Sequence, residues 1–256
     1  MWSIRQEQTE AFRQYHLQKF EDEMVIHSKE VSPRLCKILG DKQVRTVVHA
    51  GMDRARGYGF TNRGPIRLFI ELWYLFGSAF DSDPQYPWAG KILRASDDQM
   101  LRAEQLHQST LDYQEEVAGP QQANTLMALK ELTVLAARPF TFSSHDYVPG
   151  MLAEMARVFP QKAAYVGEEG LHAILREGGE EARKHRFSTL RGNVLLATLM
   201  FAFGHGCTRD LLYPWIARTL ADERIIDSAA RAARLEKKAL TWLSNVLPPS
   251  SRGTTA

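Results

Sequence analysis

Residues 76–88 read FGSAFDSDPQYPW, and residues 203–215 read FGHGCTRDLLYPW. The same offset of 127 residues aligns residues 20–93 with residues 147–220 without a gap, and 17 of the 74 aligned positions are identical. Average residue usage gives roughly four or five identities between unrelated segments of this length. The sequence therefore predicts a tandem duplication of one module.

Several identical pairs form a signature that we expect the module to need for folding. The signature residues are Arg56, Asp83, Tyr86 and Trp88 in the first copy, and Arg183, Asp210, Tyr213 and Trp215 in the second. A proline between the tyrosine and the tryptophan suits the first turn of a helix, and the two aromatic rings suit a fixed corner of a bundle. We expect the shared arginine and aspartate to form an ion pair in each copy, with a structural rather than a catalytic role.

The module is predicted to be all-α. Apolar residues recur at helical spacing in residues 4–31, and apolar helices are expected at residues 66–76 and 194–203, each followed by a glycine. Charged amphipathic helices at residues 97–117 and 222–246 are expected to close the two copies. No segment alternates as β-strands do, so we predict a helical bundle of about five to six helices per copy.

Breaks in the helical pattern indicate the domain boundaries. We expect a first helical module at residues 1–118, a linker region at residues 119–130, a second module at residues 131–247 and a disordered tail at residues 248–256. The linker begins with a Gly-Pro pair, and the tail is rich in serine, proline and threonine.

The entry to the second module differs from the entry to the first. Pro139 and Pro149 are predicted to interrupt the counterpart of the long first helix, because proline lacks the N–H that a helix interior needs. Residues 141–146 between them are expected to form a loop.

The composition is that of a globular protein with little net charge. The chain of 256 residues is 44% hydrophobic and 24% charged, with a formal net charge of +2. This balance argues against a strongly electrostatic nucleic-acid binder. The two cysteines, Cys36 and Cys207, exclude a disulfide framework, and the longest apolar run is ten residues, about half of what a membrane span needs. Because the N-terminus lacks the apolar segment of a signal peptide, we expect a cytoplasmic location and no membrane partner.

Reactive residues are not shared between the copies. No histidine and no cysteine in the aligned segments has an identical counterpart, so two equivalent catalytic or metal sites are not expected. The sequence also lacks the HExxH, CxxC, GxSxG and GxxxxGK[ST] motifs. We therefore expect no catalytic residue, metal or cofactor. One alternative is a metal-dependent hydrolase of unrecognised helical fold that uses His185, His205 and Cys207.

Basic residues gather in one part of the second copy. The candidate partner-binding residues are Arg183, Lys184, Arg186, His205 and Arg209. An acidic protein surface fits this group better than nucleic acid does, because the whole chain is nearly neutral. A nucleic-acid-binding regulator that uses residues 183–191 is a second alternative.

Three groups of residues in the first copy carry a resemblance to known proteins. They are SIRQEQ followed by Phe12-Arg13, Gly51…Ala55-Arg56…Gly59-Phe60, and Leu72…Phe76-Gly77…Phe80-Asp81…Pro87-Trp88…Ile92-Leu93. Together they resemble a group of small helical proteins encoded beside type VI secretion effectors and their spike or PAAR proteins. The resemblance covers most of the first copy and, more weakly, residues 167–220, and the second copy lacks the opening motif. It implies an immunity protein, or an adaptor or chaperone that loads an effector, and it supplies no catalytic residues.

We therefore predict a non-enzymatic cytoplasmic protein that binds a toxin effector or the PAAR or spike carrier of that toxin. The repeated helical module, the lack of shared reactive residues and the resemblance all favour this function. An immunity protein neutralises its toxin in a stable complex, whereas a loader releases an active toxin. The sequence leaves both roles open.

Overall fold

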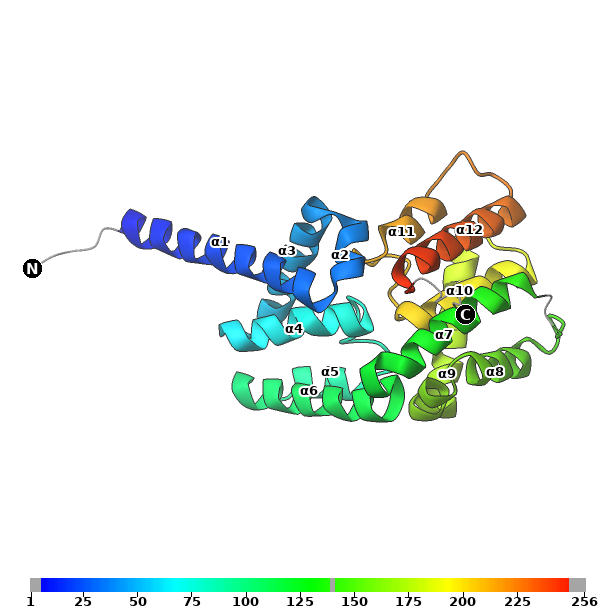
Figure 1. The fold of residues 1–256 in the computed structure, drawn as a ribbon, viewed down its shortest axis with the longest axis horizontal. Helices are drawn as coiled ribbons and strands as arrows, with labels where there is room; N and C mark the ends of the chain where they lie inside the picture. The colour runs from blue at the N-terminus through cyan, green and yellow to red at the C-terminus, as the bar shows by residue number, and fades with distance from the viewer. Residues whose placement is uncertain (1–5, 139–140, 249–256) are drawn as a thin grey trace, which may run out of the picture.

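The computed structural model describes residues 6–138 and 141–248 of the chain. Within these residues all regular structure is helical, with twelve α-helices and no β-strand (Figure 1). The predicted all-α class is therefore confirmed, whereas the duplication stays a prediction from the sequence repeat.

The helices of the two halves of the chain lie on opposite sides of the molecule (Figure 1). The first half contains α1 (Gln6–Val31), α2 (Pro33–Leu39), α3 (Asp41–Gly57), α4 (Arg63–Phe76), α5 (Pro87–Leu93) and α6 (Gln99–Tyr113). The second half contains α7 (Ala123–Ala137), α8 (Tyr147–Val158), α9 (Pro160–Lys184), α10 (Leu190–Phe203), α11 (Pro214–Leu220) and α12 (Ser228–Val246). A π-helical turn, η1 (Gln114–Ala118), and a 3-10 turn, η2 (Pro120–Gln122), connect them.

Several helices occupy matching positions in the two halves. α4 and α10 begin 127 residues apart and end 127 residues apart, and so do α5 and α11. The side chain of Asp98 caps α6 by accepting the N–H of Met100, and Asp227 caps α12 by accepting the N–H of Ala230. Such caps satisfy N–H groups that have no partner inside the helix. The Asp227 cap also explains why α12 begins later than the predicted start at Asp222.

Aromatic rings at the end of α4 form the centre of the first half. The ring centroid of Phe76 lies 4.5 Å from that of Tyr86 and 4.9 Å from that of Tyr113. Pro87 occupies the first turn of α5, and the half-buried Trp88 meets Phe76 edge-on. Rings of this size supply much of the apolar area that a small core buries. The Tyr-Pro-Trp segment thus forms a packed corner of the bundle.

The second half contains the same arrangement with one ring exchanged. The ring centroid of Phe203 lies 4.8 Å from that of Tyr213 and 4.8 Å from that of Trp242. Pro214 occupies the first turn of α11, and Trp215 is half-buried against the core. In each half, the aromatic corner therefore packs against a ring of the closing helix, Tyr113 of α6 or Trp242 of α12.

The backbone also turns at matching positions. Gly40, between α2 and α3, has a φ of 75°, and Gly167, inside α9, has a φ of 71°. Positive φ is accessible to glycine without steric cost. The C-terminal part of α9 is therefore the counterpart of α3, and its N-terminal part is the counterpart of α2.

The helix α7 starts at Ala123, inside the predicted linker region at residues 119–130. Ala128, Leu132 and Leu135 are buried along one side of this helix, at spacings of four and three residues. That side faces α10 and α12, and the burial of these three residues stabilises a helix within the region predicted as a linker.

The predicted proline breaks have different outcomes. Pro149 lies in the first turn of α8, where a missing N–H removes no intrahelical hydrogen bond, so the helix already begins at Tyr147. Residues 141–146 form the predicted loop. Pro139 and residues 249–256 of the predicted tail lie outside the described residues.

Candidate functional site

The two halves meet where α4 and α10 end. Gly77 follows α4 with a φ of 92°, and Gly204 follows α10 with a φ of 94°. A Cβ atom on Gly77 would lie 2.7 Å from the carbonyl oxygen of Phe203, and one on Gly204 would lie 2.7 Å from that of Phe76. Both glycines are therefore required by conformation and by the close approach of the two backbones.

Asp83 and Asp210 stabilise this junction, because each accepts a hydrogen bond from a backbone N–H of the other half. The N–H of His205 donates to Asp83 Oδ2 at 2.7 Å, and the N–H of Ser78 donates to Asp210 Oδ2 at 2.7 Å. Burial raises the pKa of both carboxyl groups above its ordinary value. Each aspartate therefore stabilises the turn of the other half, not the turn of its own half alone.

The predicted ion pair between the shared arginine and aspartate is wrong. Arg56 lies on the exposed end of α3 and donates to Asp53 at 2.9 Å, whereas Asp83 is 2% exposed and accepts backbone N–H groups. In the described part of the chain, Arg183 forms no ion pair with Asp210 either. A buried carboxylate that accepts several N–H bonds needs no guanidinium partner.

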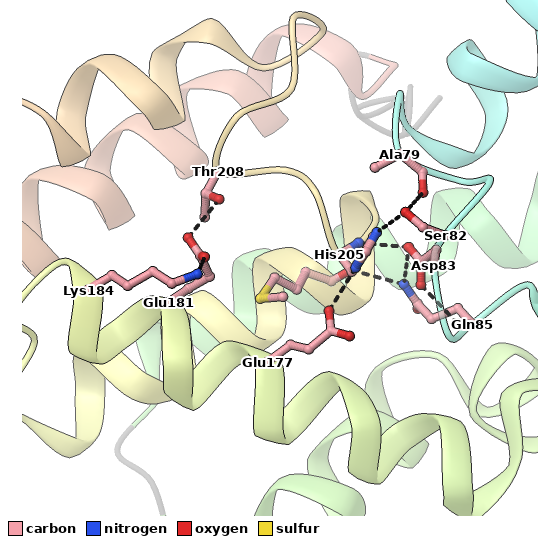
Figure 2. Close-up of polar contacts among 10 residues, drawn as sticks. Ala79, Ser82, Asp83, Gln85, Glu177, Glu181, Lys184, His205 and Thr208 are labelled. Carbon is pink, nitrogen blue, oxygen red and sulfur yellow. Dashed lines mark hydrogen bonds and ion pairs between the residues drawn. The ribbon is translucent and has the colours of Figure 1, made fainter. Parts of the chain in front are cut away.

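His205 connects three segments at the same junction (Figure 2). Its Nδ1 lies 2.7 Å from Glu177 Oε2 on α9, and its Nε2 lies 3.1 Å from Ser82 Oγ in the loop after α4. This is the order of groups in a hydrolytic triad. The Ser82 hydroxyl also lies 3.2 Å from the carbonyl oxygen of Ala79, which competes with His205 Nε2 for its single proton. These contacts connect the two halves, and no spacing in the sequence paired Ser82 or Glu177 with His205.

The residues of the enzyme alternative are not assembled into a site. Cys207 is fully buried, and burial raises the pKa of its thiol well above the ordinary value. His185 lies near Glu181, whereas His205 faces Glu177 and Ser82. Among the described residues, no group of three or more His, Cys, Asp or Glu side chains is placed to hold a metal ion.

A buried lysine lies beside the junction and was not predicted. Lys162 is 3% exposed, and its Nζ donates to the carbonyl oxygen of Phe201 at 2.5 Å. Its ammonium also lies 5.5 Å from the centroid of the Tyr86 ring. Burial lowers the pKa of Lys162 to about 8, and the charge of Asp83 opposes that shift. Its counterpart in the first half is Leu35. This difference between the two copies is the sequence feature from which the buried lysine could have been predicted.

Four of the five candidate partner-binding residues lie around the C-terminal end of α9. Arg183 and Lys184 end the helix, and Arg186 follows two residues later. The hydroxyl of Thr208 donates to Glu181 Oε2 at 3.0 Å (Figure 2), which holds the neighbouring Arg209 close to the same end of α9. All four basic side chains are exposed. We call Arg183, Lys184, Arg186 and Arg209 the basic corner.

The fifth candidate, His205, does not belong to the basic corner. Its imidazole is 17% exposed and is engaged by Glu177 and Ser82. The neighbouring His185 adds no fixed charge to the corner at neutral pH, because burial lowers its pKa. The charge of the corner therefore comes from its arginines and its lysine, with Lys184 partly offset by an ion pair to Glu181 at 2.6 Å.

Arg186 has a left-handed backbone conformation, and the residue at the equivalent position of the first half is a glycine. Its φ is 58°, and the corresponding residue in the first half, Gly59, has a φ of 77°. The left-handed region costs a residue with a Cβ atom roughly 1–2 kcal/mol. Within the described residues, the Arg186 side chain has no hydrogen bond or ion pair that would offset this cost. The folded chain alone thus gives no reason for an arginine here.

Comparisons with known proteins return nothing: no family model matches the chain, and no match is found among curated proteins or among solved structures. In the part of the chain that the structure describes, no helix combines the length and apolar character needed to cross a bilayer.

Proposed function

We propose that this chain binds another protein through the basic corner and has no catalytic role. The observation that carries the proposal is the strained backbone of Arg186, which holds an exposed guanidinium where Gly59 occupies the equivalent position. Strained residues persist where the surrounding structure holds them in place, and they are concentrated at functional sites. Arginine is also among the residues most enriched where protein interfaces are strongest.

The partner that fits the basic corner presents an acidic surface. Three arginines and one lysine within one corner complement carboxylate groups, and arginine binds a carboxylate through two parallel hydrogen bonds. From the resemblance of the first half, we propose a toxin effector of type VI secretion, or its PAAR or spike carrier, as that partner. The chain would then serve as an immunity protein or as a loading adaptor.

Charge reversal at the basic corner tests this function. The triple variant R183E/K184E/R186E is expected to lose a stoichiometric partner that the tagged wild type captures from cells of its own host. The variant K237E/K238E is the matched control, since it reverses two exposed lysines on α12 outside the corner. Equal capture by both variants, or capture of no acidic protein by the wild type, would contradict the proposal. Toxicity of the captured protein, alone and in complex, separates immunity from loading.

Arg186→Gly is expected to separate binding from stability. Glycine removes the strain at φ 58°, so the free energy of unfolding should stay the same or rise by up to about 1 kcal/mol. The loss of the guanidinium should weaken partner binding by roughly tenfold or more. Urea unfolding and titration calorimetry with the captured partner measure the two effects. A variant that is destabilised and binds normally would show that Arg186 serves the fold.

A further inference from the structure

A groove between α4 and α6 is open in the first half. Its volume is about 490 Å³, and it is lined by Pro65, Leu68, Met100 and Ala103, with Arg67 and Glu104 among its charged residues. Met100 is 52% exposed, so the groove presents apolar surface to solvent. We call it the first-half groove.

The counterpart groove in the second half, between α10 and α12, is filled by α7. Leu132 and Leu135 of α7 line the space that remains there, together with Leu195 of α10, the counterpart of Leu68. Only about 60 Å³ remains between the three helices. The module is therefore complete in the second half, where a helix covers this face, and incomplete in the first.

The segment that precedes each module follows a different path relative to its groove. In the second half, α7 is followed by a loop at residues 141–146 and then by α8, so the chain folds back and α7 covers the groove. In the first half, the counterpart of α8 is the C-terminal part of α1, and the helix continues straight on toward the N-terminus. The N-terminal part of α1 projects away from the body (Figure 1) and cannot cover its own groove.

The projecting part of α1, residues 6–16, has an apolar surface of its own. Phe12 is 68% exposed and Tyr15 is 63% exposed, and their ring contacts in the described structure are to His16 on the same helix. Phe12 and Tyr15 are three residues apart, so their rings lie on the same side of the helix and form one exposed aromatic patch. We call residues 6–16 the arm.

We propose that two copies of this chain exchange arms, so that the arm of each copy lies in the first-half groove of the other. Exchange of an identical element between protomers is an established route to a symmetric dimer, and it occurs where a connection that could fold back is held extended. The arm is such an element, because the straight α1 replaces the helix, loop and helix of the second half. The exchange would give the first-half groove the helical cover that α7 gives its counterpart.

Two exposed methionines provide a matched test of arm exchange. The wild type is expected to be a dimer by light scattering, and Met100→Glu should weaken dimerisation by roughly tenfold or more because it places a charge in the groove. Met127→Glu, at a residue of α7 that is 66% exposed and outside the groove, should leave the dimer intact. Phe12→Ser/Tyr15→Ser should weaken the dimer as Met100→Glu does. A wild type that stays monomeric from about 1 to 100 µM, or a dimer that resists both changes, overturns the proposal.

Cross-linking distinguishes exchange from other modes of dimerisation. Two differently tagged chains, one carrying Phe12→Cys and the other Met100→Cys, are expected to form a disulfide with each other under mild oxidation. The native cysteines, Cys36 and Cys207, are buried and do not compete. A dimer that gives no such cross-link overturns arm exchange. Arg186→Gly should not affect the dimer, so failure of this proposal is distinguishable from failure of the basic corner.

Discussion

Replacing Gly77 with alanine is expected to lower the free energy of unfolding by about 3 kcal/mol or more, which corresponds to a Tm roughly 10 °C lower. Gly77 combines a φ of 92° with a ψ of 158°, a region that residues with a Cβ atom almost never occupy. The new methyl group would also lie 2.7 Å from the carbonyl oxygen of Phe203, a backbone atom at the end of α10 that cannot rotate aside as a flexible side chain would. The change would therefore disrupt the junction between the halves.

Gly64→Ala is the matched control, because Gly64 lies in the first turn of the same helix and a Cβ atom there would have nothing within 4 Å of it. It should change the free energy of unfolding by about 0.5 kcal/mol or less. Gly204→Ala should cost as much as Gly77→Ala, and the double variant should cost less than the sum, since both changes affect one contact. Urea unfolding measures all four proteins. Similar stabilities for the Gly77 and Gly64 variants would show that the junction tolerates a side chain.

The repeat in the sequence was sufficient to predict the all-α class and the residues at which α4 and α10 end. Gly77 and Gly204 follow the apolar helices as expected, and the Tyr-Pro-Trp segments start α5 and α11. These features are local, because each depends on the conformational preference of one residue or on the first turn of one helix. The internal repeat therefore predicted those helix starts and ends that depend on a few neighbouring residues.

The partners at the junction could not be predicted from the same repeat. The identity of Asp83 and Asp210 in both halves indicated that the fold needs them, but each accepts an N–H from a residue more than a hundred positions away. No spacing rule connects such residues, and the carboxylate accepts from a backbone N–H, which every residue type except proline supplies. The repeated Arg56 was the wrong partner because its side chain remains in solvent beside Asp53.

Differences between the halves were more informative about candidate sites than identities. The pair Gly59 and Arg186 contains the strained position of the basic corner, and the pair Leu35 and Lys162 contains the buried lysine. Neither residue belongs to a recognisable motif. Only the structure gives the left-handed φ of Arg186 and the burial of Lys162, and these two properties make the substitutions costly.

Lys162→Met is expected to raise the free energy of unfolding near neutral pH by about 1–3 kcal/mol. The folded chain lowers the pKa of Lys162 from 10.5 to about 8, because burial disfavours the ammonium. Each unit of pKa shift corresponds to about 1.4 kcal/mol, and the lost hydrogen bond to Phe201 and lost attraction to Asp83 offset part of the gain. Methionine matches the length and volume of the lysine stem, so the change should leave no large cavity.

The sign of the pH dependence follows from proton binding. Burial raises the pKa of the Cys36 and Cys207 thiols, so these two groups make stability fall as the pH rises through the unfolded thiol pKa. Between the folded pKa of about 8 and the unfolded value of 10.5, the unfolded chain binds more protons at Lys162 than the folded chain does, so Lys162 by itself contributes a rise of stability with pH. Lys162→Met should remove that rise, whereas Lys237→Met, at an exposed lysine, should retain it. Urea unfolding from about pH 7 to pH 9.5 tests this, below the range in which buried tyrosines of raised pKa, such as Tyr213, begin to act in the opposite direction. A destabilised Lys162→Met variant with the wild-type pH profile would show that the ammonium stabilises the junction, and that its attraction to Asp83 outweighs the cost of its burial.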